Sequence, residues 1–376
     1  MTSSAPLSGT VVVEIGHSIA APFAGLVLGQ LGAEVIKVEE PRRGDHARGW
    51  GPPLQDGSAP IFHAMNREKQ GVAVDLREAS AREALAQLIL ERADVVVQNL
   101  RANSIEALGL GAAALLERKP SLIYCNLSAF GRLGPLGGKP GYDPLMQAYG
   151  GLMSVTGEAG GPAVRVGVSI IDVGTGMWSV IGIIAALLER ARTGKGGIVD
   201  TSLYETALSW MGAHIAEFSS GGHDSRRYGS GAPQIAPYEM FETADSHLMV
   251  AAGNDALFGK LSAVLGQPQW RDDERFRTNQ ARVRNRGVLA AMLRDLFREQ
   301  STAYWRERLD AAGVPNAPLR TIAEVARDAQ TQALGILQAL PAANVTTVGL
   351  PIRFDGIRPA LRRGSPQLGE HTSELL

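Results

Sequence analysis

Short apolar runs alternate with amphipathic stretches along the first half of the chain. Residues 10–39 contain an apolar run, TVVVEI, a turn, GHS, a helical stretch, APFAGLVLGQLG, and a second apolar run, EVIKVE. This order predicts a βαβ unit whose two strands lie parallel in one sheet. The pattern continues with the strand-like runs GVAVDL, DVVVQNL and SLIYCNLS, separated by helical stretches. The first half therefore predicts an α/β domain with a doubly wound parallel sheet.

The pattern changes near residue 220. A small-residue loop, SSGGHDSRRYGSGAP, precedes a hairpin-like pair, YEMFETADSHLMVAAG, and then helices rich in Arg, Asp and Glu. The tail segment TTVGLPIRF is typical of a strand pair that returns to the larger body. We expect a large domain over residues 1–220 completed by 325–376, a glycine-rich linker loop over 221–232, and a smaller α+β domain with its return linker over 233–324.

Charge and cysteine content limit the classes of function. Of the 376 residues, 37 are Lys or Arg and 38 are Asp or Glu, a balance that gives no electrostatic footprint for nucleic acid or an anionic membrane. Cys125 is the single cysteine, so we expect no disulfide, no metal site and a reducing compartment. The N-terminus lacks a signal or transit pattern, and the apolar run 173–188 falls short of the roughly 20 residues of a membrane span. We therefore expect a cytoplasmic protein.

Two polar residues follow predicted strands, where doubly wound sheets bind their ligands. The first turn, GHSIAAPFAG, lacks the G-x-G-x-x-G spacing of a dinucleotide site. His17 in this turn either faces a ligand or caps the turn. Asn99 ends DVVVQN, where its amide either binds a ligand or makes a turn.

Cations gather in two loops next to predicted strands. Such loops are either solvated faces or, where they converge, sites for a phosphorylated ligand. The cations of the first loop are Arg42, Arg43 and Arg48, and those of the second are Arg67 and Lys69.

Asp172 stands in VGVSIIDVGTG, at the start of a long apolar helix that RTGKGG ends. One reading makes it the helix N-cap. Gly174 and Gly176 cost the first turn about 1 kcal/mol each relative to Ala, which suggests a close approach to the backbone. The helix dipole favours an ionised carboxylate, which is a nucleophile toward activated acyl groups. The helix N–H groups then hold the developing negative charge.

Several segments in fixed order resemble the family III CoA-transferases, the CaiB/BaiF family, which includes formyl-CoA transferase and α-methylacyl-CoA racemase. The resemblance spans nearly the whole chain. Its segments are GAEVIKVEEPRRGDHARGW, NREK with GVAVDL, ADVVVQN, GYDPLMQAYGG, DVGTGMWSVIGIIAALLERARTGKGGIVDTSL, IAPYEMFETAD and AAGNDALFGKL.

The resemblance implies an interlocked homodimer with a Rossmann-like large domain and a smaller domain. Asp172 falls on the family's catalytic aspartate, which attacks an acyl-CoA thioester and passes through a mixed anhydride to an aspartyl-CoA thioester. The partners implied are acyl-CoA and small carboxylic acids, with CoA thioester as cosubstrate and no other cofactor. We expect no nucleic acid or membrane partner.

Other site residues are carried over by position. Lys69 and Asn99 match CoA contacts, His17 matches a histidine of the first turn, and GSGAP, with Gly229 and Gly231, matches a glycine loop that covers the intermediates. Glu40 replaces an arginine near the adenine, a role that falls to Arg42 or Arg43. Ile19 replaces a glutamine of formyl-CoA transferase, which disfavours oxalate or formyl substrates. The expected CoA-binding set is Arg42, Arg43, Arg67, Lys69, Asn99, Arg101 and Lys139.

Tyr142 separates two activities of the family. Racemases resemble GHDINY where this chain reads GYDPLMQ, and a tyrosine with an ordinary pKa of about 10 is a poor proton acceptor. This favours a transferase, with Tyr142 donating to a substrate carboxylate or orienting Asp172. The second half resembles dicarboxylate-handling transferases, for which Arg48 or Arg165 would bind the second carboxylate. A racemase and a non-catalytic acyl-CoA-binding homologue remain the alternatives.

Overall fold

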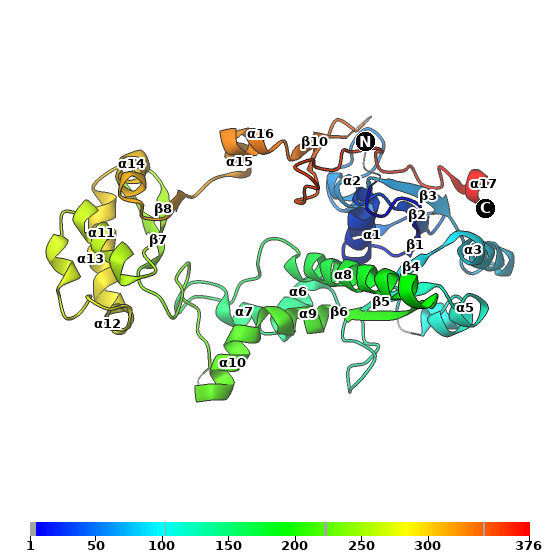
Figure 1. The fold of residues 1–376 in the computed structure, drawn as a ribbon, viewed down its shortest axis with the longest axis horizontal. Helices are drawn as coiled ribbons and strands as arrows, with labels where there is room; N and C mark the ends of the chain where they lie inside the picture. The colour runs from blue at the N-terminus through cyan, green and yellow to red at the C-terminus, as the bar shows by residue number, and fades with distance from the viewer. Residues whose placement is uncertain (1–4, 102, 222–223, 341–342) are drawn as a thin grey trace. The chain divides into compact units, whose positions relative to one another are not determined.

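The computed structural model describes residues 5–101, 103–221, 224–340 and 343–376 (Figure 1). The chain forms two compact units. The large unit comprises the described parts of Met1–Leu152, Val166–Ser219 and Ala329–Leu376, and the small unit those of Met153–Arg165 and Ser220–Asp328. This division places residues 153–165, the glycine-rich loop and residues 325–328 in the small unit.

A six-stranded parallel sheet forms the centre of the large unit, which confirms the predicted α/β class. The strand order is β3-β2-β1-β4-β5-β6, the classic order of a doubly wound sheet. The direction of winding reverses between β1 and β4, so their carboxyl ends border the crevice where such sheets bind ligands. The strands are β1 Val11–Ile15, β2 Glu34–Glu39, β3 Lys69–Ala73, β4 Val95–Gln98, β5 Ile123–Ser128 and β6 Gly197–Ser202.

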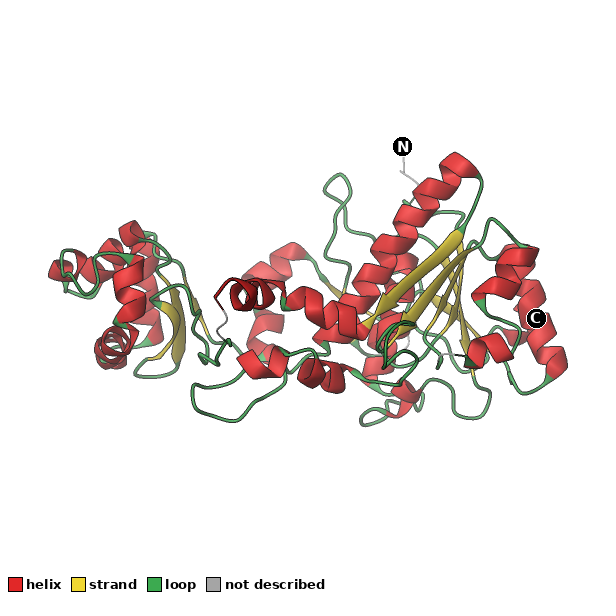
Figure 2. Ribbon diagram, turned by 90° about the horizontal axis from the view of Figure 1, so that it is seen from below, coloured by secondary structure: helices red, strands yellow, loops and turns green. Residues whose placement is uncertain are grey.

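Helices cover both faces of this sheet (Figure 2). On one face α3 (Ala79–Arg92) and α5 (Ala112–Arg118) bury side chains against alternate strand residues such as Val13 and Ile36. On the other face lie α1 (Ala20–Gln30) and α8 (Ile170–Thr193), which pack on each other. Because strand side chains alternate between faces, residues next to Val13 and Ile36 point toward α1.

Helix α8 ends as predicted, with Gly194 in the left-handed region at φ 73. At 24 residues it is longer than the apolar run 173–188, and by length and composition alone it would pass as a membrane span. A core helix passes the same test, and α8 contacts α1, β5 and β6 of this chain.

Gly174 and Gly176 allow close helix packing within the chain. A Cβ on Gly174 would lie 2.7 Å from Cζ2 of Trp210, and one on Gly176 2.8 Å from the carbonyl oxygen of Ala20. The close approach to the backbone that the sequence suggested is therefore made by α9 (Leu203–Trp210) and α1 of the chain itself.

The remaining elements of the large unit are mostly short. The predicted strand pair of the tail is present as β10 (Leu337–Ala339) antiparallel to β11 (Thr346–Val348). The C-terminal segment then follows β3, where the His371 N–H donates to the Gly71 carbonyl at 2.9 Å. The helices are η1 His46–Gly49, α2 Pro60–Asn66, α4 Ser104–Ala107, α6 Asp143–Tyr149, α7 Leu152–Val155, α10 Gly212–Gly221, α16 Ala329–Leu334 and α17 Thr372–Leu375; α7 and α10 run into the small unit.

The small unit is an α+β fold, as predicted. The expected hairpin is β7 (Tyr238–Glu242) paired with β8 (His247–Ala251), and β9 (Asn316–Pro318) adds a third antiparallel strand. Its core includes Phe241 and Trp305. The helices are α11 Asp255–Val264, η2 Pro268–Arg271, α12 Asn279–Arg284, α13 Arg286–Arg298, α14 Thr302–Ala312 and α15 Ile322–Arg327.

Candidate active site

A strained turn follows β1 at the crevice. Ser18 has φ 72, a conformation that is uncommon for a residue other than glycine and that persists only when its surroundings hold it. The Ser18 N–H donates to Oδ1 of Asp45 at 2.8 Å. The neighbouring peptide is held by Asn99, whose Oδ1 accepts from the His17 N–H at 3.0 Å and whose Nδ2 donates to the His17 carbonyl at 2.9 Å. These contacts fix where the His17 ring projects.

A buried ionic cluster supports this turn from below. Nζ of Lys37 lies 2.9 Å from Oε1 of Glu14 and 2.8 Å from Oδ2 of Asp45, and it donates to the Gly16 carbonyl at 3.0 Å. Burial opposes the charge of Lys37, but Asp45 and Glu14 raise its pKa above the usual value. Removing one member of such a cluster would leave an unpaired buried charge, which is strongly destabilising.

Lys69 also belongs to the cluster. Its Nζ lies 2.6 Å from Oε2 of Glu14 and donates to the Pro22 carbonyl and to Oδ1 of Asn66. The side chain is fully buried, and burial, partly offset by Glu14, lowers the pKa of Lys69 to about 8. The structure thus places this predicted CoA contact beneath the turn, not on the cavity surface.

Asp172 is the third residue of α8, because the helix begins at Ile170 with Ser169 as its N-cap. The N-cap reading of Asp172 is therefore wrong. Oδ2 of Asp143 instead accepts from the N–H groups of Ile171, at 2.7 Å, and Asp172, at 3.2 Å. Asp143 thereby occupies two of the helix donors that the sequence offered for a developing oxyanion.

The protonation of Asp172 also differs from expectation. Burial and the charge of Asp143 raise the pKa of Asp172 to about 7, whereas the helix start alone predicted a readily ionised group. A carboxylate with a raised pKa is more basic and hence a better nucleophile once it is ionised.

A cavity of about 340 Å³ opens beside Asp172. Tyr142 is half exposed within it and precedes α6. The cavity brings together predicted residues from four separate segments of the chain. They are His17, Asn99, Arg101, Lys139, Tyr142 and Asp172.

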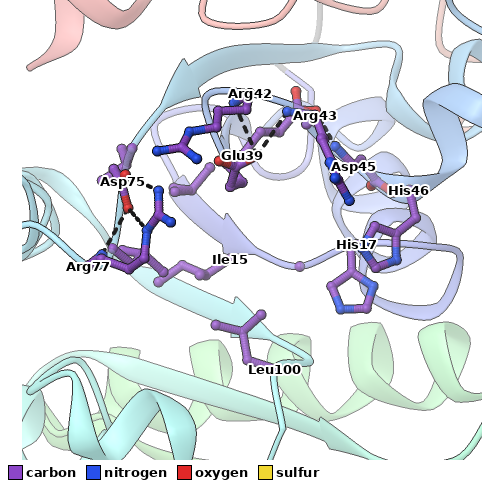
Figure 3. A pocket seen from close by; sticks show the side chains of 16 residues that line it. Ile15, His17, Glu39, Arg42, Arg43, Asp45, His46, Asp75, Arg77 and Leu100 are labelled. Atoms are coloured by element: carbon purple, nitrogen blue, oxygen red, sulfur yellow. Dashed lines mark hydrogen bonds and ion pairs between the residues drawn. The ribbon is translucent and has the colours of Figure 1, made fainter.

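A second cavity, of about 530 Å³, continues from the first, because both are lined by His17, His46 and Leu100. Figure 3 shows the His17 and His46 rings on one side and Arg77 with Asp75 on the other. The ring centroids of the two histidines are 4.8 Å apart.

Three guanidinium groups line this second cavity. Within the described residues, the Arg42 and Arg43 guanidinium groups make no hydrogen bond or ion pair, whereas Arg77 donates twice to Asp75, at 2.8 and 2.5 Å. Cations of this kind suit phosphate groups. No group of three or more His, Cys, Asp or Glu within the described part of the chain is placed to hold a metal ion.

Two other predicted cations are engaged elsewhere. Arg48 pairs with Glu39 at 2.7 Å and lies over the Phe62 ring at 3.7 Å. Arg67 is buried and donates to the carbonyls of Ala64 and Val348, and burial lowers its pKa. Neither lines the cavity beside Asp172.

The remaining predicted residues, Arg165, Gly229 and Gly231, lie in the small unit. Gly229 has φ 62, and its N–H donates to the Gly157 carbonyl at 3.0 Å. A residue with a side chain would be strained there.

Sequence reasoning missed three residues of the site: Arg77, His46 and Asp143. Arg77 carried a usable signal, since it follows the strand-like run GVAVDL just as Asn99 follows DVVVQ. His46 and Asp143 stand in two of the segments that carry the resemblance, but their importance comes from contacts with distant residues.

CoA-transferase family III matches this chain over residues 7–372. The succinyl-CoA:glutarate CoA-transferase of Mus musculus is 33% identical over 377 residues, covering 100% of this chain and 86% of the mouse protein. The succinate–glutarate CoA-transferase of Agrobacterium fabrum is 36% identical over 385 residues, covering 99% and 95%. A solved CaiB/BaiF family protein from Brucella suis has a TM-score of 0.89 at 39% identity, covering 99% of both chains. Since these matches run the full length, the chain belongs to the family III CoA-transferases and is a CoA-transferase.

Proposed function

We propose that this enzyme moves CoA from a short dicarboxylyl-CoA, such as succinyl-CoA, to a carboxylic acid through an aspartyl-CoA thioester on Asp172. The observation that carries the proposal is the place of Asp172 in a cavity that continues into one lined by Arg42, Arg43 and Arg77. Relatives named for succinyl-CoA, glutarate and D-citramalate support the substrate class.

The reaction begins with an ionised Asp172. One carboxylate oxygen attacks the thioester carbonyl of the donor, the C–S bond breaks, and CoA leaves as a thiolate, which gives a mixed anhydride. The thiolate then attacks Cγ of Asp172, and the donor acid leaves as a carboxylate. The acceptor carboxylate attacks the aspartyl thioester, and the same steps run in reverse. No net proton is gained or lost.

The cavity residues have separate tasks in this proposal. Arg42, Arg43 and Arg77 bind the phosphates of CoA, which acts as cosubstrate without a further cofactor. Burial lowers the pKa of His17, so its ring is neutral at pH 7 and can donate one N–H. That N–H and the Tyr142 hydroxyl are donors for the oxyanion of the attacked carbonyl.

The cations near Asp172 suit the carboxylates of donor and acceptor. Arg101 and Lys139 are exposed and line the same cavity. They replace Arg48 as the candidates in the large unit for the second carboxylate of a diacid.

We further propose that the enzyme is a homodimer, as the family resemblance implies. Helix α8 carries large apolar side chains with high exposure, including Met177 at 49%, Ile181 at 54% and Leu188 at 70%. A second copy of the chain would cover them. Ile181→Glu should weaken the dimer in sedimentation velocity, while the exposed, charged Arg192→Glu on the same helix should leave the mass unchanged.

Trapping the intermediate tests the proposed reaction. The enzyme is incubated with succinyl-CoA and then with hydroxylamine or borohydride, and Asp172 is examined by peptide mass spectrometry. We expect a hydroxamate or an alcohol at Asp172, and none in Asp172→Asn. Full transfer activity in Asp172→Ala would refute the mechanism. Exchange of an α-proton in deuterated water without an acceptor acid would instead support a racemase.

A further inference from the structure

Asp143 accepts hydrogen bonds from the first turn of α8, next to Asp172. Its Oδ2 accepts from the N–H groups of Ile171 and Asp172, and its Oδ1 accepts from Nε2 of Gln147 at 2.6 Å. Gln147 in turn accepts from the Val166 N–H at 2.8 Å. Asp143 and Gln147 are both buried, with exposed fractions of 2% and 0%.

The donors around Asp143 are all neutral. Across the described residues no ion pair involves either Asp143 or Asp172. The negative charge of Asp143 is therefore held in place by hydrogen bonds but not cancelled, and at the site of Asp172 it acts through a poorly solvated medium.

Other titratable groups reach the cavity from several elements. They are His17 after β1, His46 of η1, Arg101 after β4, and Lys139 and Tyr142 before α6. Burial raises the pKa of Asp172 most, and the charge of Asp143 raises it further.

We propose that Asp143 is a positioning residue that holds the first turn of α8 and, by its uncancelled charge, favours the covalent states of Asp172 over its free carboxylate. The proposal rests on the proposed function, since it requires Asp172 to be the nucleophile. Asp143 itself touches no reacting atom in the steps given above.

The change in the charge of Asp172 during the reaction explains how Asp143 would favour the intermediates. Before attack, Asp172 and Asp143 are both negatively charged, and Oδ2 of Asp143 lies 3.2 Å from the backbone nitrogen of Asp172. In both the mixed anhydride and the aspartyl thioester Asp172 is neutral, and the negative charge has moved to the CoA thiolate or to the departing acid. Repulsion from Asp143 is relieved as the first bond forms, so it raises the free energy of the starting state more than that of the intermediates.

Asp143→Asn tests the role of the charge, because it keeps an acceptor oxygen for the Ile171 N–H. We expect the acid limb of kcat/KM against pH to move down by one unit or more. Since one unit corresponds to a tenfold change in an equilibrium, the fraction of enzyme trapped as aspartyl-CoA at pH 8 should fall roughly tenfold. A purely structural role would lower activity without moving the acid limb.

Two further variants keep the test decisive if Asp143→Asn fails to fold. Gln147→Glu adds a second negative charge beside Asp143 and should move the acid limb upward. The double variant Asp143→Asn with Gln147→Glu exchanges amide and carboxylate and keeps the hydrogen bond between them. The charge then lies on residue 147, behind the residue that contacts α8. The pH of the acid limb should therefore fall between those of the wild type and Asp143→Asn. An unmoved limb and unchanged adduct in folded variants would overturn the proposal, whereas absence of any adduct at Asp172 in the wild type would refute the proposed function instead.

Discussion

The side-chain amide of Asn99 brackets the peptide of His17, accepting from its N–H at 3.0 Å and donating to its carbonyl at 2.9 Å. A ligand-binding role and a turn role for Asn99 were both open from the sequence. The hydrogen bonds give it the second role, since both polar ends of the amide are used on the backbone, and the amide still lines the cavity beside Asp172.

Asn99→Ala should loosen the His17 turn and lower kcat more than it raises KM for acyl-CoA, because the ring of His17 would lose its fixed direction. Two hydrogen bonds of about 1 kcal/mol each correspond to a loss of roughly 10- to 30-fold. Steady-state kinetics with both substrates measure this. Asn99→Asp keeps the acceptor and loses the donor, so its kcat should lie between those of the wild type and Asn99→Ala. An increase in KM as large as the decrease in kcat, in all variants, would contradict the positioning role.

Ionisation of Asp172 should destabilise the fold. Its pKa is about 7 in the folded protein and about 3.9 when unfolded, so the folded state binds the proton more tightly. The stabilising contribution of this group is present below pH 4 and is lost as the pH rises toward 7. Asp172→Asn should therefore raise the free energy of unfolding at pH 8, by at most about 4 kcal/mol, with the gain vanishing near pH 4.

Thermal unfolding at several pH values measures this gain. Asp75→Asn serves as a control of opposite sign, because hydrogen bonds from Arg77 lower the pKa of Asp75 to about 2. Asp75→Asn should therefore lower the free energy of unfolding at neutral pH. A wild-type enzyme no less stable than Asp172→Asn at pH 8 would show that the carboxylate has a charged partner in solution.

Gly176→Ala should destabilise the large unit. The added Cβ would lie 2.8 Å from the Ala20 carbonyl oxygen and 2.9 Å from Cδ1 of Phe23, and such overpacking costs about 1–3 kcal/mol. Gly212→Ala is the matched control in α10, because nothing lies within 4 Å of its added Cβ and Ala favours the helix. Chemical denaturation of both variants compares them, and equal stability would mean that α8 and α1 can separate at no cost.

Arg42→Ala and Arg43→Ala should each raise KM for acyl-CoA several-fold with little change in kcat, and should weaken its dependence on salt. Arg77 lines the same cavity, so Arg77→Ala should also raise KM for acyl-CoA. Arg92→Ala is the control, since Arg92 is an exposed cation paired with Glu34 at 2.7 Å outside the cavity. Isothermal titration with free CoA in 50 and 300 mM salt is the direct measurement, and an effect of Arg92→Ala as large as the others would contradict a phosphate site.

Much of the fold was predictable because its signals are local. Strand and helix periods in residues 10–39 predict the βαβ unit directly, and the glycine of RTGKGG marks the end of α8. The domain boundary was harder, since residues 153–165 belong with a unit whose other part begins at residue 220. No local pattern carries such a long-range association.

The sequence by itself determined the doubly wound sheet, the hairpin of the small unit and the family. Hydrophobic periodicity and the order of the matching segments can be read without knowing which residues are in contact. Only the tertiary structure decided which charged groups face the cavity. Lys69 and Arg42 were both expected in charged loops. Lys69 instead begins β3 and pairs with Glu14 in the interior, whereas Arg42 lines the cavity.

The state of Asp172 was likewise beyond the sequence. Its pKa depends on burial and on Asp143, which lies 29 residues earlier in the chain. Electrostatic effects follow distance in space and the surrounding medium, not spacing along the sequence. Asp172 therefore does not cap the helix that begins in VGVSIIDVGTG; Asp143, the first residue of α6, accepts from two of its first N–H groups.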